Sequence, residues 1–192
     1  MPVATCAADR SRSPSSSRPD PADREAHWTT TSRWPLSRPE PCSGGACRAG
    51  AALGGGDAGQ VDLLGDYGHH TGVAFQLFDD LLPYLDDAVV TGKPATSDAA
   101  NLRPTWPVLL AHRDGGPAVR RAVETALSGD LGPSEAHEML RAAVTADDLW
   151  DAARCGARGH ADRAVARLGE LPGAEAARRL AGIAAIAVDR DR

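Results

Sequence analysis

Aromatic side chains are scarce in this sequence, and lysine is almost absent. Phe, Trp and Tyr make up only 4% of the 192 residues. Alanine and leucine must therefore do most of the packing, which favours helices over sheets and predicts an all-α fold. All of the 21 basic residues except Lys93 are arginine. The formal net charge of −5 argues against a nucleic-acid partner, because binding to phosphates requires a basic surface.

Paired cysteines and long apolar runs are also missing. None of the four cysteines belongs to a C-x-x-C pair, and no histidine lies at zinc-ligand spacing from them, so no zinc site is predicted. The N-terminus has no apolar run of the kind found in secretory signals or membrane anchors. We therefore expect no membrane span, and a reducing cytoplasm is the expected compartment.

The chain divides into two parts of different composition. Residues 1–44 are rich in Ser, Pro and Arg, and proline interrupts every short run. Such a segment cannot bury enough apolar surface to fold, so we predict that residues 1–44 are disordered. Residues 45–192 carry helical periodicity, interrupted by a connection at residues 88–104, and are predicted to form one partial helical domain.

Glycine and proline mark where the helices of this domain begin and end. A short helix of small residues should end at Gly54-Gly55-Gly56, and Pro107, Pro117 and Pro133 should lie near helix starts. A longer helix is predicted by apolar or small residues at intervals of three and four. These residues are Val61, Leu64, Gly68, Thr71, Phe75, Phe78, Leu82 and Leu85. Gly68 and Gly72 lie on or near this face and would let another helix approach closely.

The candidate chemistry lies beside this long helix, in the sequence FQLFDDLLP from Phe75 to Pro83. Gln76 lies three and four residues before Asp79 and Asp80, so we expect the three polar groups to share one side of the helix. Adjacent carboxylates repel each other unless a cation lies between them. Carboxylates are also the ligands that Mg²⁺ prefers, and Mg²⁺ commonly bridges to a substrate phosphate.

Further motifs follow in a fixed order. Asp86-Asp87 come seven residues after the first pair, then Gly92-Lys93-Pro94, Asp98, and Arg103 before Thr105 and Pro107. In this order the sequence resembles the polyprenyl diphosphate synthase family over residues 45–192, which has FQxxDDxxD, GKP, a basic residue and T-L-P before an apolar helix. The resemblance implies the C-terminal part of the all-α isoprenoid synthase fold, with the second aspartate-rich motif of the family.

The resemblance also implies an activity and a site. Members condense an allylic diphosphate with isopentenyl diphosphate, and Mg²⁺ stabilises the departing diphosphate. By position, Asp79 would be a direct Mg²⁺ ligand and Asp80 would hold the metal's water shell. Gln76, Lys93 and Arg103 would contact the diphosphate. Family members usually dimerise, so the resemblance is compatible with a homodimer or a heterodimer.

Two departures from the family pattern limit this expectation. Pro83 replaces the last carboxylate of the motif, and within a helix it would remove a hydrogen bond and introduce a kink. No other DDxxD precedes Phe75, so the N-terminal half of the family's fold is expected to be absent. The chain alone is therefore predicted to be inactive or weakly active. The alternatives are a non-catalytic subunit of a heteromeric synthase and a non-functional gene fragment.

The histidines receive no functional role at this stage. His69 and His70 are neighbours that point about 100° apart on a helix, which makes them poor joint ligands. His112 and His137 are expected to be ordinary surface residues.

Overall fold

The computed structural model describes residues 41–85, 103–171 and 173–189. Residues 1–40 of the expected disordered segment lie outside this range, as do Asp86, Asp87, Lys93 and Asp98. Residues 41–44 of that segment are helical, so the boundary predicted at residue 44 is wrong by these four residues. Every regular element in the described ranges is a helix, which confirms the predicted all-α class. The elements are α1 Pro41–Leu53, α2 Ala58–Asp79, η4 Leu82–Tyr84, α4 Trp106–Asp114, α5 Pro117–Ala126, α6 Pro133–Val144, α7 Leu149–Arg167, η5 Leu168–Glu170 and α8 Ala174–Ala187.

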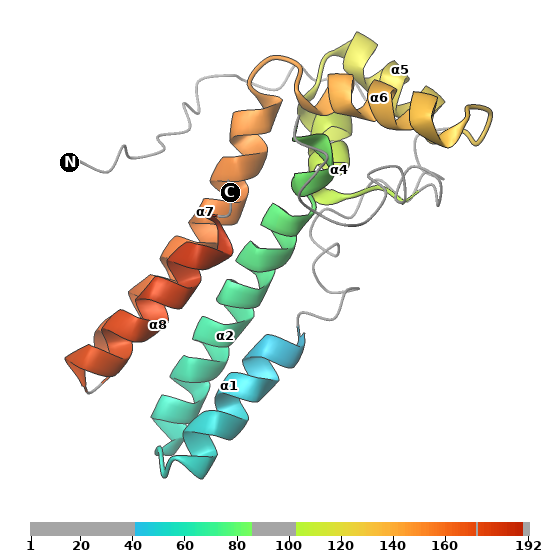
Figure 1. The fold of residues 1–192 in the computed structure, drawn as a ribbon. Helices are drawn as coiled ribbons and strands as arrows, with labels where there is room; N and C mark the ends of the chain where they lie inside the picture. The colour runs from blue at the N-terminus through green and yellow to red at the C-terminus, as the bar shows by residue number, and fades with distance from the viewer. Residues whose placement is uncertain (1–40, 86–102, 172, 190–192) are drawn as a thin grey trace, which may run out of the picture.

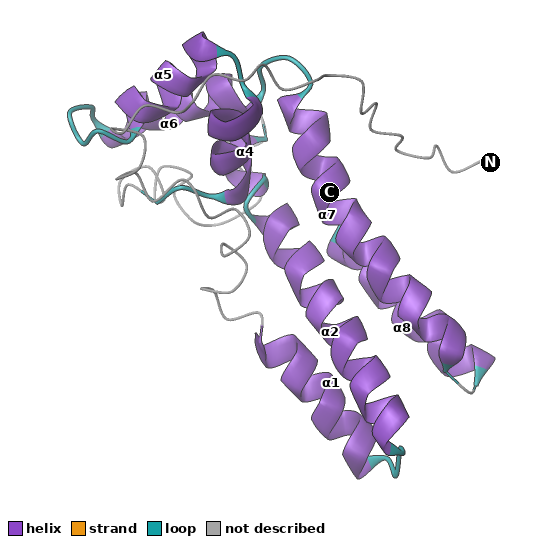
Figure 2. Ribbon diagram, turned by 180° about the vertical axis from the view of Figure 1, so that it is seen from behind, coloured by secondary structure: helices purple, strands orange, loops and turns teal. Residues whose placement is uncertain are grey.

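The helices form two regions, which we call the stem and the head. The stem consists of the elongated helices α1, α2, α7 and α8, and the head consists of the shorter helices α4, α5 and α6 at one end of it (Figure 1). Helix α2 runs toward the head and α7 runs away from it, with α1 on the outer side of α2 (Figures 1 and 2). The C-terminal end of α2 therefore lies against the head.

Local sequence signals explain most helix boundaries. Asp57 caps α2: its side chain accepts a hydrogen bond from the Gln60 amide at 2.9 Å, and the Gln60 side chain accepts one from the Asp57 amide at 3.1 Å. This reciprocal pair satisfies two donors that a helix start otherwise leaves unpaired. Helices α5 and α6 begin directly at proline, and α4 has Pro107 as its second residue, as expected from the fixed φ of proline.

Helix α2 ends earlier than the sequence pattern predicts. The helix stops at Asp79, and Pro83 lies in the short 3-10 turn η4. The expectation of a proline inside a continuous helix is therefore wrong. A proline ring clashes with the preceding turn and offers no N–H, and here the chain leaves the α-helix before the ring is reached. The expected buried face is also shifted, because Phe75 is 46% exposed.

Three clusters of buried residues hold the regions together. One lies within the head and includes Val123 and Leu140, and a second joins α2, α4 and α7 around Leu77 and Ala157. The third lies in the stem, where the Tyr67 hydroxyl donates a hydrogen bond to the Leu180 carbonyl of α8 at 2.8 Å. Within the described ranges, no helix combines the length and the apolar character needed to cross a membrane.

Candidate functional site

The two aspartates of the motif lie in different surroundings at the end of α2. Asp79 is exposed, whereas Asp80 is only 4% exposed. Neighbouring residues on a helix point about 100° apart, and the head covers only the second of them. The expected arrangement, with Gln76 and both carboxylates on one side, therefore holds for Gln76 and Asp80 but not for Asp79.

Both carboxylate oxygens of Asp80 accept hydrogen bonds from the protein. One accepts from the Gln76 Nε2 at 2.8 Å, and the other accepts from the backbone N–H of Trp106 at 3.0 Å. Trp106 is the first residue of α4, so Asp80 connects the end of α2 to the start of α4 across 26 residues of sequence. A carboxylate at this position also interacts favourably with the positive end of the α4 dipole.

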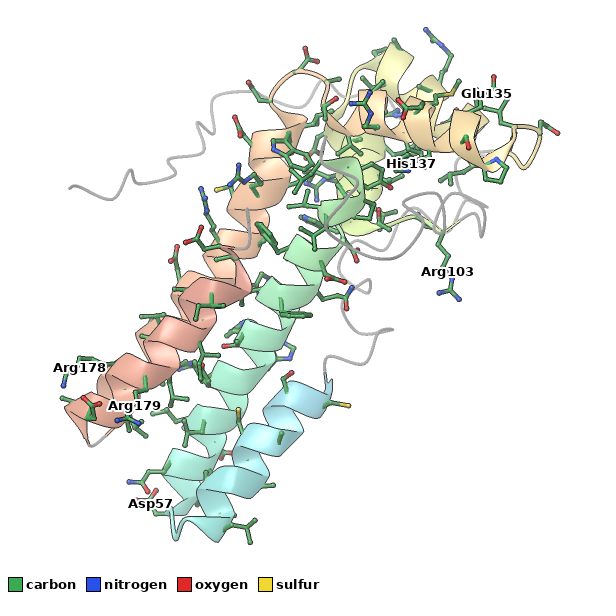
Figure 3. The ribbon with its side chains drawn as sticks, viewed as in Figure 1. Asp57, Arg103, Glu135, His137, Arg178 and Arg179 are labelled. Atoms are coloured by element: carbon green, nitrogen blue, oxygen red, sulfur yellow. The ribbon has the colours of Figure 1, made fainter. Side chains whose placement is uncertain are left out.

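Thr105, just before α4, is held by a second contact. Its hydroxyl lies 3.2 Å from the Tyr84 hydroxyl, and both residues are buried. The Tyr84 ring in turn stacks on His137, with ring centroids 5.5 Å apart. The prediction that His137 is a surface residue is therefore wrong: it is 7% exposed and lies between α6 and α4 (Figure 3). Its spacing of three residues from the buried Leu140 was the signal for this.

The Trp106 side chain connects the start of α4 to α7. Its indole Nε1 lies 3.5 Å from the Ala153 carbonyl, and a Cβ placed on Gly156 would come within 3.1 Å of the ring. The start of α4 is therefore held by α2 through Asp80 and by α7 through the indole. These contacts place the two candidate motifs, one ending α2 and one preceding α4, at a fixed junction.

The basic residues predicted to bind diphosphate are only partly described. Arg103 lies three residues before Trp106, is exposed, and points away from the helices (Figure 3). Lys93 lies outside the described residues. Of the predicted site residues, the structure thus brings Gln76 and Asp80 into direct contact and leaves Asp79 and Arg103 at the surface.

The described residues offer an incomplete set of metal ligands. Asp79 fits a Mg²⁺ ligand because its carboxylate is exposed at the end of α2. Asp80 already accepts two protein hydrogen bonds, and Pro83 holds the position of a third carboxylate. In the described ranges, no group of three or more His, Cys, Asp or Glu side chains is arranged to hold a metal ion. A Mg²⁺ ion bound to Asp79 would need further oxygen ligands from outside the described residues.

A pair of histidines that the sequence did not predict lies in the stem. His70 of α2 and His160 of α7 face each other, with their Nδ1 atoms 3.3 Å apart. Burial, Arg163 and the neighbouring histidines lower the pKa of His160 to about 4. Burial, followed by His69 and Arg163, also lowers the pKa of His70. Because 90 residues separate the pair, no local spacing could have predicted it.

Comparison with known proteins places these features in a family. The family model described as Polyprenyl synthetase matches residues 43–153, more than half of the chain. The octaprenyl diphosphate synthase of Escherichia coli (strain K12) is 38% identical over 130 residues, which are 67% of this chain and 40% of that protein. The (2E,6E)-farnesyl diphosphate synthase of Mycobacterium bovis is 41% identical over 76 residues, which are 40% of this chain and 21% of that protein.

Solved structures give the same result. A polyprenyl synthase from Caulobacter crescentus CB15, complexed with calcium and isoprenyl diphosphate, matches with a TM-score of 0.70 and 31% identity. The match covers 78% of this chain and 46% of that one. A geranylgeranyl pyrophosphate synthase from Corynebacterium glutamicum, complexed with isoprenyl diphosphate and magnesium, matches with a TM-score of 0.64 and 27% identity over 73% of this chain and 40% of that one.

This chain therefore spans less than half the length of these relatives. The order of motifs from Phe75 to Pro107, the all-helical architecture and the match over residues 43–153 agree. The chain belongs to the polyprenyl synthetase family, and its described helices form the C-terminal part of the isoprenoid synthase fold.

Proposed function

We propose that this chain forms one wall of a prenyltransferase site of isoprenoid biosynthesis. In such a site an allylic diphosphate condenses with isopentenyl diphosphate. The proposal is supported by the family and by two structural relatives that bind isoprenyl diphosphate together with calcium or magnesium.

The observation that carries the proposal is the surface at the end of α2. Phe75 and Asp79 are four residues apart, so they lie on the same side of the helix, and both are exposed. An aromatic ring beside a carboxylate suits a ligand with an apolar chain and a metal-bound anionic head.

Each candidate residue then has a distinct proposed task. Asp79 would ligate Mg²⁺, and Lys93 and Arg103 would contact the diphosphate oxygens. Gln76 would lie between the diphosphate and Asp80. The Asp80 carboxylate would lie next to the water molecules that surround the metal. When bound, Mg²⁺ would supply electrostatic stabilisation of the departing diphosphate.

Turnover by the chain alone is expected to be weak or absent. The sequence contains one aspartate-rich motif, and Pro83 occupies that motif's last position. A non-catalytic subunit of a heteromeric synthase is the second candidate function. It is favoured by the exposed side chains of Ile183 and Ile186, which lie three residues apart on α8 and provide apolar surface for another chain.

Calorimetric titration of the purified chain with inorganic diphosphate, with and without Mg²⁺, tests the proposed site. We expect Mg²⁺-dependent binding that Asp79→Asn weakens about tenfold or more, which corresponds to a loss of ~1.4 kcal/mol or more. Asp130→Asn is the matched control, because Asp130 is an exposed carboxylate between α5 and α6. Unaltered binding in Asp79→Asn, or no Mg²⁺-dependent binding by the unmodified chain, would contradict the proposal.

A turnover assay separates the two candidate functions. The chain is incubated with Mg²⁺, an allylic diphosphate and isopentenyl diphosphate, alone and with a second chain that carries a DDxxD motif. Product formed only in the mixture supports a subunit role. Steady turnover by the chain alone would overturn the expected inactivity.

A further inference from the structure

We infer that Asp80 is a positioning residue, which caps helix α4 from the end of α2 and so fixes the geometry of the diphosphate site. The inference depends on the proposed function only for the identity of the site that Asp80 positions, namely the diphosphate site. The capping contact itself is independent of that function. It gives Asp80 a structural task beyond the role at the metal's water shell that the family resemblance implies.

The start of α4 lacks a cap from its own sequence. Thr105 occupies the N-cap position with an extended backbone, but its side chain makes no capping hydrogen bond, and its hydroxyl lies against Tyr84 instead. The amide of Leu109 bonds to the Thr105 carbonyl at 3.0 Å, and Pro107 has no amide hydrogen to satisfy. The Trp106 N–H is the donor that the Asp80 carboxylate accepts, at 3.0 Å.

Burial makes this contact energetically important. Asp80 is 4% exposed, and its bond to the partly buried Trp106 N–H lies next to the buried pair Tyr84 and Thr105. A donor that is shielded from water costs more when it loses its acceptor than the hydrogen bond itself contributes, in proportion to how little water can reach it. Gln76 donates to the other oxygen at 2.8 Å, which orients the carboxylate toward α4.

The capped junction controls the distance between the proposed ligand contacts. Asp79 is adjacent to Asp80 in sequence, and Arg103 lies three residues before Trp106. Loss of the cap would release the start of α4 from α2, and Arg103 would shift relative to Asp79. Misplacement of a binding group by about 1 Å is enough to reduce activity strongly. Asp80 thus acts through Trp106 and not by direct contact with the metal.

Two measurements on three variants test the assignment: hydrogen exchange of the Trp106 amide, and Mg²⁺-dependent titration with inorganic diphosphate. In Asp80→Asn the new amide oxygen can still accept the Trp106 N–H, and Gln76 can turn its own amide to pair with the new NH₂ group. We therefore expect Trp106 to remain protected and diphosphate affinity to fall by less than about tenfold. Asp80→Ala should lose both the protection and most of the affinity.

Asp79→Asn is the complementary variant, in which Trp106 should remain protected while Mg²⁺-dependent binding falls about tenfold or more. The inference is overturned if Asp80→Asn loses binding as fully as Asp79→Asn does while Trp106 stays protected, because Asp80 would then act as a ligand. It is also overturned if Trp106 exchanges equally fast in the unmodified chain and in Asp80→Ala. If Asp80→Ala does not fold, Asp80→Asn still decides between the roles.

If the proposed function is wrong, the two measurements should give a different combination of results. The unmodified chain would then show no Mg²⁺-dependent diphosphate binding. The Trp106 amide would nevertheless remain protected in the unmodified chain and in Asp80→Asn. That result would retain Asp80 as the cap of α4 and remove only the site that it positions.

Discussion

The head and the stem are both helical in the described part of the chain, yet their cores use different side chains. The head cluster is built around branched residues that are almost fully buried, namely Val108, Val123, Leu140 and Val144. In the stem cluster, the most deeply buried positions are Ala164 and Ala184. The head is packed by side chains that fill space, and the stem is packed by helices that approach each other closely.

The α1–α2 contact in the stem shows how close this approach is. A Cβ on Gly68 would lie 2.6 Å from both the Ser43 carbonyl oxygen and the Cys47 Sγ. One of these atoms belongs to the backbone, so a rotamer change cannot make room. The two regions should therefore respond differently to mutation. The head should lose stability when buried side-chain atoms are removed, and the stem should lose stability when atoms are added between its helices.

The largest effect is expected for Leu140→Ala in the head. Leu140 is fully buried, so its truncation should leave a cavity and lower the free energy of unfolding by about 2–5 kcal/mol. Denaturant titration of the purified chain measures this loss. Leu53→Ala is the control, because Leu53 is 91% exposed and its replacement should change little. A loss below about 1 kcal/mol would show that the head collapses around the missing side chain.

The next largest effect is expected for Gly68→Ala in the stem. The added methyl group meets α1, and overpacking of this kind should lower the free energy of unfolding by about 1–3 kcal/mol. Gly182→Ala in the middle of α8 is the matched control, because no atom lies within 4 Å of its new Cβ. That variant should gain about 0.5–1 kcal/mol from helix propensity. Equal stability of the two variants would contradict close packing in the stem.

Much of this architecture follows from local sequence. Gly54-Gly55-Gly56, Pro117 and Pro133 coincide with helix boundaries, because the backbone restrictions of glycine and proline act within one turn. Gly68 was also correctly expected to permit close helix approach. The boundary at Asp79 was missed, since the apolar spacing continues through Leu82 and Leu85 and hides the effect of Pro83.

The site could be predicted only in outline. Residue order predicted Gln76, Asp79 and Asp80 as candidates, but it did not predict that Asp80 is buried and bonded to the start of α4. The contact between Asp80 and Trp106 spans 26 residues, and the contact between His70 and His160 spans 90. Such pairs depend on how α2, α4 and α7 pack together, and no local periodicity contains that information.

The histidine pair allows a pH test that is specific to the stem. The folded pKa of His160 is about 4, below its ordinary value near 6.5, so the unfolded chain binds a proton in this interval that the folded chain does not. Stability should therefore be unaffected by this group above pH 6.5 and should fall as the pH decreases from 6.5 to about 4. Protonation of His160 would add positive charge beside Arg163, His70 and His69, which together with burial lower its pKa.

Measurement of unfolding against pH for the unmodified chain and for His160→Gln isolates this effect. Glutamine can still form a hydrogen bond with His70 but does not titrate, so the stability curve of the variant should be flatter between pH 6.5 and 4. Some slope should remain, because the pKa of His70 is also lowered. Parallel curves for the two proteins would mean that the pair does not destabilise the stem in acid.

The smallest effect is expected at the start of α8, on the outer side of the stem. Glu175 pairs with Arg178 at 2.6 Å and with Arg179 at 2.8 Å, and all three side chains are well exposed. Figure 3 labels the two arginines. Exposed pairs at this helical spacing contribute roughly 0.3–0.5 kcal/mol each, so Glu175→Gln should cost less than about 1 kcal/mol and less still in high salt. A larger, salt-sensitive loss in thermal unfolding would show that charge on α8 contributes more to the stability of the stem than exposed pairs at this spacing ordinarily do.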